Sequence, residues 1–120
     1  MRPKIDGAQF GSITIDGSNI EHDVLIRLSG EITKRKKKLS KAVFGTSHTI
    51  SLEEAEYIFE KKADRLIVGS GHNGMVSLSA EAAEYLKKKG VRVDLSPTPE
   101  AIHRWNKAKD STIGLFHVTC

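Results

Sequence analysis

The stretch RLIVGSGHNG, residues 65–74, decides the fold, because a short apolar run at Arg65–Val68 breaks abruptly into glycines and small polar residues. A second apolar run, Val91–Leu95, ends in the same way, in SPTPEAIHRWN at residues 96–106. Strands that end in small polar residues just before a helix are how α/β proteins build a binding crevice at the carboxyl edge of a sheet. The two runs therefore predict an α/β fold with a candidate site where they end.

About three helices are expected around these strands. Their starts carry capping residues, and their ends are marked by glycine or by the loss of apolar periodicity. One helix lies between the two apolar runs, which is the arrangement of a right-handed parallel crossover and places both strand exits on one edge of the sheet. The helices are expected at residues 51–63 with Ser51 as cap, from Ser79 to Gly90, and from Thr98 as cap with Pro99 at the first helical position.

The first third of the chain is typical of β structure. Residues 11–34 alternate apolar and polar side chains, and turn signals at Asp16–Gly17 and Ser29–Gly30 divide the run, so a β meander is expected. Residues 35–50 show no clear element. Because a structureless connection of that length is unusual, we expect Ala42–Phe44 to pack against the domain.

The composition indicates a single domain, residues 1–120, located in the cytoplasm. A chain of 120 residues with 38% hydrophobic residues can bury one core. Its single cysteine, Cys120, excludes an internal disulfide and fits a reducing cytosol. No run approaches the ~20 apolar residues of a membrane span, so no membrane partner is expected. The frequent Lys and Glu, with one Gln and one Cys, give a thermophile-like balance.

The glycine-rich loop also matches a dinucleotide-binding pattern. Gly69, Gly71 and Gly74 fit G-x-G-x-x-G, and Asp94 lies at the spacing of a ribose-binding acid. In a dinucleotide fold, however, the third glycine lies within the helix that opens on the pyrophosphate. Here four extended-looking residues separate Gly74 from the expected cap at Ser79. We therefore interpret the glycines as permitting a tight turn with positive φ, and we expect no cofactor.

A basic run, Lys34–Lys38 with Lys41 beyond it, is the candidate for nucleic-acid binding, since clustered positive charge releases counterions from phosphates. The net charge is only +4, and no aromatic residue within the run could stack on bases. A solvated hairpin end explains the run at least as well. We expect no specific nucleic-acid binding, and the role of the run stays open.

The five histidines do not have the spacing of a metal site, because they form no helical H-x-x-x-H pair and have no cysteine beside them. No metal is therefore expected. His117, which alternates with Phe116 and Val118, is expected to be a satisfied structural residue. His72 differs, because it lies in the glycine loop, where its side chain could face a ligand.

Three motifs resemble a small family of domains of unknown function. They are the strand and loop Ile67–Gly71, the helix start Thr98–Ala101 followed by Asn106, and the closing residues His117–Cys120. The family includes archaeal stand-alone proteins, a mammalian adipogenesis-associated domain protein and a mitochondrial respiratory complex I assembly factor. Val68 departs slightly from the family pattern I-G-x-G. The resemblance implies a three-layer α/β fold with a central mixed sheet and an added β ribbon, and it brings no established reaction.

The expected crevice contains no complete nucleophile–base set, so we favour a non-catalytic binding or assembly module with an unknown protein partner. The alternative is an enzyme acting on a small anionic substrate, with His72 near the ligand and the free amides at Thr98–Ala101 receiving its charge. Asn106 borders the face of the third helix that packs on the sheet, where a buried amide would need partners. The residues expected to line the crevice are Gly69, Ser70, Gly71, His72, Thr98 and Asn106.

Overall fold

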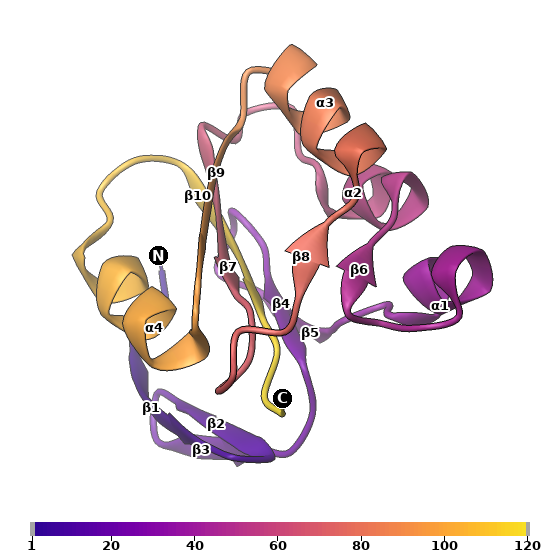
Figure 1. Ribbon diagram of the computed structural model, residues 1–120. Coiled ribbons are helices and arrows are strands. Elements are labelled where there is room, and N and C mark those ends of the chain that lie inside the picture. Colours follow the sequence, from indigo (N-terminus) through magenta and orange to yellow (C-terminus); the bar gives the residue numbers. More distant parts are fainter. Residues whose placement is uncertain (1, 120) are drawn as a thin grey trace.

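A five-stranded mixed sheet lies at the centre of the protein (Figure 1), in a computed structural model that describes residues 2–119. The parallel strands β7 and β9 carry the two apolar runs, and Gly69 lies opposite Ser96 at their carboxyl ends. The predicted parallel crossover is therefore confirmed. In spatial order the strands are β5 (Ile32–Lys34), β4 (Val24–Ile26), β10 (Thr112–Phe116), β7 (Arg65–Gly69) and β9 (Arg92–Ser96).

Each face of this sheet buries its own hydrophobic cluster, because alternate side chains of a strand point to opposite faces. Val24 and Ile26 belong to one cluster, and Leu25 between them belongs to the other. The Leu25 side is covered by α2 (Leu52–Ile58) and α3 (Ala80–Lys88), with the short parallel pair β6 (Thr49–Ile50) and β8 (Ser77–Leu78). The other side is covered by α4 (Thr98–Lys107) and the N-terminal strands.

The N-terminal strands form an antiparallel sheet of their own, made of β1 (Ile5–Gln9), β2 (Ser12–Ile15) and β3 (Ser18–Ile20). The meander expected over residues 11–34 is thus divided between two sheets, because β4 and β5 join the central one. The burial of the strands explains the division. All three residues of β4 are buried, as a strand covered on both faces requires, whereas β2 alternates between buried and half-buried side chains.

A fourth helix, α1 (Lys38–Phe44), occupies the region where no element was predicted, so residues 2–119 contain one helix more than expected. The mixed α/β class is as predicted, but the layering is less simple, because a helix layer and a small sheet share each side of the central sheet. The expected packing of Ala42–Phe44 is wrong, since Val43 and Phe44 are 52% and 41% exposed. The helix is held instead through its buried residue, Ser40.

The helix starts agree with the sequence at two positions. Ser51 and Ser79 accept hydrogen bonds from backbone N–H groups three residues on, as caps do. Helix α2 nevertheless ends at Ile58 rather than at residue 63, because Phe59 leaves the helical conformation, with ψ 136°. Within residues 2–119, no helix is both long and apolar enough to cross a membrane.

Candidate functional site

The glycine-rich loop and the start of α4 meet directly at the carboxyl edge of the central sheet. The Thr98 hydroxyl accepts a hydrogen bond from the N–H of Gly71 at 2.9 Å and donates one to the His117 carbonyl at 2.7 Å. The N–H of Thr98 donates to the carbonyl of Gly71 at 3.1 Å. Two segments far apart in sequence are therefore brought together, but the Thr98 side chain fills the space that an open crevice would need.

Thr98 does not cap α4, which corrects the expectation from sequence. The helix begins after Pro97, at ψ 148°, so Thr98 is its first residue and its buried side chain turns toward the loop. This close approach requires glycine at position 69, where a Cβ atom would lie 2.9 Å from Thr98 Oγ1 and 2.8 Å from Phe116 Cδ1. Positive φ is the requirement elsewhere in the loop, with values of 100° at Gly71 and 67° at Gly74.

Replacing Thr98 with valine is expected to lower the free energy of unfolding by about 2–3 kcal/mol, because a buried N–H and a buried carbonyl would lose their partner. Thr98→Ser keeps the hydroxyl and should lose clearly less. Urea denaturation of both variants checks this. Equal losses would mean that the methyl group of Thr98, rather than its hydroxyl, supplies the stability.

Two other residues predicted for the site lie in the same loop. Ser70 is buried, and its N–H donates to the carbonyl of Ser96 at 2.8 Å. The N–H of His72 donates to the carbonyl of Thr119 at 2.9 Å, and its ring lies 6.0 Å from that of Phe10 in the turn between β1 and β2. Within residues 2–119, the Nε2 atom of His72 is buried without a hydrogen-bond partner. Backbone hydrogen bonds to Ser96 and Thr119, which lie outside the loop, therefore hold it in place.

Asn106 does not join this group. Its side-chain amide pairs with both backbone groups of Ile5, accepting from the N–H at 3.0 Å and donating to the carbonyl at 2.8 Å. The amide has backbone partners, but they belong to β1 rather than to the glycine loop, and the expectation that Asn106 is buried is wrong, because the residue is exposed. Asn106 fastens the N-terminal strand to α4.

Of the backbone amides expected to receive a small anion, those of Thr98 and Ala101 are engaged within the protein. The N–H of Thr98 bonds to Gly71, Pro99 has no N–H, and the N–H of Ala101 donates to the carbonyl of Pro97 at 2.9 Å. Among residues 2–119, only the N–H of Glu100 in this set has no such partner, and a single N–H gives the anionic-substrate alternative little support.

A buried ion cluster, formed by Asp23, Arg35, Glu54 and His117, lies beside the loop. Arg35 forms a bidentate pair with Glu54, at 2.7 Å from Nε and 3.0 Å from Nη2. Its Nη1 lies 3.0 Å from Asp23 Oδ2, which also lies 2.7 Å from His117 Nδ1. The exposed fractions of these side chains are only 1–6%. Asp23 lies directly before β4, Glu54 lies in α2, and Arg35 belongs to the basic run, so distant segments are joined here.

Sequence reasoning missed this cluster, apart from the structural role of His117. The available signal was that Arg35 is the single arginine among four lysines at residues 34–38, since arginine suits bidentate carboxylate pairing and lysine does not. Glu54 gave a misleading signal, because it fits a capping box with Ser51. Its N–H does bond to Ser51, but its carboxylate accepts from Arg35 and Ser40.

The cluster keeps Asp23 ionised. Burial alone would raise the pKa of Asp23, but hydrogen bonds from His117 and from the N–H of Val118, with the charges of His117 and Arg35, lower it from 3.8 to about 2. A pKa below the unfolded value stabilises the fold above the unfolded pKa and ceases to do so as pH falls through the folded pKa. At 1.36 kcal/mol per unit, this contribution is roughly 2 kcal/mol.

We therefore expect the stability difference between the wild type and Asp23→Asn to be full near pH 5 and to shrink as pH falls from about 4 toward 2. Urea unfolding at a series of pH values measures it. A difference that stayed constant over this range would show that Asp23 does not titrate with a lowered pKa.

His117 also contacts a hydroxyl group. Its Nε2 lies 3.1 Å from Thr119 Oγ1, so that hydroxyl, imidazole and carboxylate follow one another from Thr119 through His117 to Asp23. The ring of His48 lies edge-on at 5.7 Å. In residues 2–119, no three His, Cys, Asp or Glu side chains are grouped as metal ligands. Cys120, from which no chemistry is expected, lies outside the described residues.

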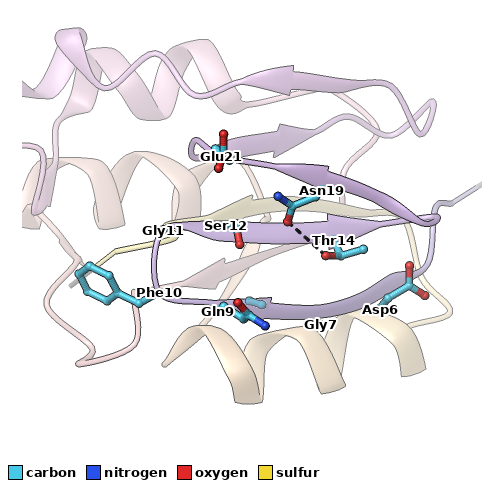
Figure 2. A pocket seen from close by; sticks show the side chains of 10 residues that line it. Asp6, Gly7, Gln9, Phe10, Gly11, Ser12, Thr14, Asn19 and Glu21 are labelled. Carbon is cyan, nitrogen blue, oxygen red and sulfur yellow. Dashed lines mark hydrogen bonds between the residues drawn. The ribbon is translucent and has the colours of Figure 1, made fainter.

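A cavity of about 800 Å³ lies over the outer face of the N-terminal sheet (Figure 2). Hydrogen-bonding side chains from β1, β2 and β3 line it, among them Gln9, Ser12, Thr14 and Asn19. Ser12 and Thr14 alternate along β2 with the buried Ile13 and Ile15, which is the pattern of a solvated sheet face. At one end of this face, the side chain of Phe10 projects beyond the strands and is 67% exposed.

Comparisons with known proteins agree with the resemblance read from the sequence. Residues 5–112 match a family described as protein of unknown function (DUF498/DUF598). A conserved hypothetical protein from Pyrococcus horikoshii OT3 is 38% identical, with a TM-score of 0.88 over 98% of this chain and 99% of its own. The structure named MT938 is 31% identical, with a TM-score of 0.82 over the same shares, 98% and 99%. A Mth938-like domain protein of Bordetella pertussis, 13% identical, shares the fold over 97% of this chain and 85% of its own, with a TM-score of 0.65.

Proposed function

The chain belongs to the DUF498/DUF598 family of proteins of unknown function, which brings no reaction with it, and we propose that it is a non-catalytic binding module for a partner protein. The docking site is the loop surface, formed by Phe10, His72 and Met75 at the carboxyl edge of the central sheet. One observation carries this proposal. Phe10 and Met75 are 67% and 54% exposed beside a loop in which the N–H groups of Ser70, Gly71, His72 and Gly74 already bond within the protein.

Aromatic and methionine side chains are enriched at protein interfaces, where burying them supplies much of the binding free energy. The loop surface is also braced, by Thr98 and by the His72–Thr119 backbone bond, so docking would order little of the chain. The likeness to a complex I assembly factor noted in the sequence points in the same direction. An assembly role, and action in the cytoplasm as the cysteine usage suggests, are parts of the proposal.

The test is to isolate the protein from cells that produce it naturally and to compare copurifying proteins for three forms. They are the wild type, the double variant Phe10→Ser/Met75→Ser, and the control Leu95→Ser, whose side chain is 42% exposed on the edge strand β9. We expect a stoichiometric partner that binds purified wild type and the control alike and binds the double variant at least about tenfold more weakly. Equal binding by all three, or a stoichiometric small molecule in native mass spectrometry, would contradict the proposal.

The enzyme alternative has one observation in its favour, the sequence of contacts from Thr119 through His117 to Asp23. A hydroxyl beside an imidazole that a carboxylate orients is the arrangement of acyl-transfer enzymes. Incubation with p-nitrophenyl acetate tests this alternative. The alternative requires that the wild type releases p-nitrophenol and becomes acetylated at Thr119. Both results should be retained in Cys120→Ser and lost in Thr119→Val. If the wild type shows neither, the enzyme alternative is wrong.

A further inference from the structure

A second surface of the protein, separate from the loop surface, combines positive charge with exposed apolar side chains. No Asp or Glu occurs between Glu31 and Glu53, a segment that carries five lysines. All five lysines are exposed, whereas the arginine among them is neutralised by Asp23 and Glu54. We call this surface the basic ledge, and its residues are Lys34, Lys36, Lys37, Lys38, Lys41, Val43 and Phe44.

The apolar part of the ledge lies at the end of α1, which forms the outer edge of the domain at the right of Figure 1. Val43 and Phe44 are 52% and 41% exposed there, directly after the lysines in the chain. A hollow of about 380 Å³ is lined by residues 34–38. The ledge therefore has two separate features, a recess lined by cationic side chains and an exposed apolar end. A solvated hairpin end needs neither of them.

The ledge is held in place rather than free to move. Ser40 donates to the Glu54 carboxylate, the Ser51 hydroxyl donates to the Leu39 carbonyl at 3.1 Å, and Arg35 anchors the start of the segment. These bonds attach α1 through polar contacts and leave Val43 and Phe44 exposed. A partner would thus meet charges and apolar groups that are already arranged.

We propose that the basic ledge binds an acidic segment of a partner protein, one that carries large apolar residues among its Asp and Glu side chains. Charge complementarity selects an anionic partner, and burial of Val43 and Phe44 requires apolar groups on that partner. A nucleic-acid backbone would meet the lysines but would leave both apolar side chains in water. Two apolar side chains also give little area for insertion into a lipid surface. The basic ledge is a different surface from the loop surface, so the protein would have two docking sites.

Fluorescence anisotropy with two labelled peptides of equal charge tests the proposal. One repeats Glu-Leu-Asp-Phe and the other repeats Glu-Ser-Asp-Ser. At about 150 mM salt we expect the apolar peptide to bind the wild type at least about tenfold more tightly than the serine peptide. Val43→Ser/Phe44→Ser should remove that preference while leaving the weak binding of the serine peptide.

The chain provides a matched control for charge. Lys36→Glu/Lys37→Glu/Lys38→Glu should weaken binding of the apolar peptide by about tenfold or more, whereas the same change at Lys87, Lys88 and Lys89, at the end of α3, should alter it by less than about threefold. Both triplets are exposed and each has one lysine over an aromatic ring, Lys36 over Tyr57 and Lys89 over Phe59. Equal losses from the two triplets would overturn the proposal, because attraction would then follow net charge alone.

Two further outcomes would also overturn it. Tighter binding of a DNA duplex of about 20 base pairs, or of phosphatidylserine vesicles, lost in the Lys36–Lys38 variant, would assign the ledge to a different polyanion. Loss of peptide binding in the variant Phe10→Ser/Met75→Ser would show that the peptide binds the loop surface instead. The proposal for the ledge expects that variant to keep peptide binding, whereas the proposal for the loop surface expects it to lose the partner protein. The two proposals can therefore fail independently.

Discussion

Replacing Arg35 with methionine is expected to lower the free energy of unfolding by about 3–5 kcal/mol. The physical reason is that two buried carboxylates, Asp23 and Glu54, would lose the cation that both contact at 2.7–3.0 Å. Lys36→Met is the control, because it removes the same charge from the next residue, which is exposed. Its expected cost is below about 1 kcal/mol. Urea denaturation at neutral pH measures both.

A second substitution tests whether the loss of stability comes from leaving the Glu54 carboxylate buried without its cation. The double variant Arg35→Met/Glu54→Leu should recover part of the stability, because an apolar pair of similar volume can replace a buried ion pair. Since small domains are stable by only about 5–15 kcal/mol, circular dichroism should be recorded first to confirm that Arg35→Met still folds. If Arg35→Met cost no more than Lys36→Met, the carboxylates would have to be hydrated, which their burial argues against.

Much of the fold could be predicted because it follows from local periodicity. The apolar runs at β7 and β9, the helix between them and the caps at Ser51 and Ser79 are all encoded within a few residues. Helix α1 was missed for the opposite reason. Its buried residue is Ser40, so it has no apolar face toward the core, and the bonds that hold it involve residues more than ten positions away.

The candidate site was predictable in position but not in its contacts. Topology alone places the ends of β7 and β9 on one edge, and Thr98 therefore lies beside the glycine loop. What the side chain does there depends on the carbonyl of His117, which β10 brings from the far end of the chain. Asn106 likewise finds its partner in β1. The pairing of Asp23 with Arg35 and His117 has no local signature, because only the folded sheet brings these residues together.

Gly114 is a residue that local sequence reasoning could not single out, yet its replacement by alanine is expected to cost about 3 kcal/mol. It lies in the centre of β10, beneath two rings that pack edge to face with centroids 5.9 Å apart. A Cβ atom there would lie 2.6 Å from Phe116 Cε2 and 2.9 Å from Trp105 Cζ3. Both rings are fully buried, so neither can move aside without displacing α4 or β10.

The control for this substitution is Gly7→Ala in β1, where a Cβ atom would meet nothing within 4 Å and the expected change is below about 0.5 kcal/mol. A second background tests the mechanism, because Trp105→Phe removes the indole ring, whose Cζ3 and Cε3 atoms would lie 2.9 and 3.1 Å from the added methyl group. The cost of Gly114→Ala should then fall by about 1 kcal/mol or more, since substitutions in direct contact are not additive. If the cost were the same in both backgrounds, the clash with Phe116 alone would account for it, and α4 would not depend on the glycine in β10 for its position on the sheet.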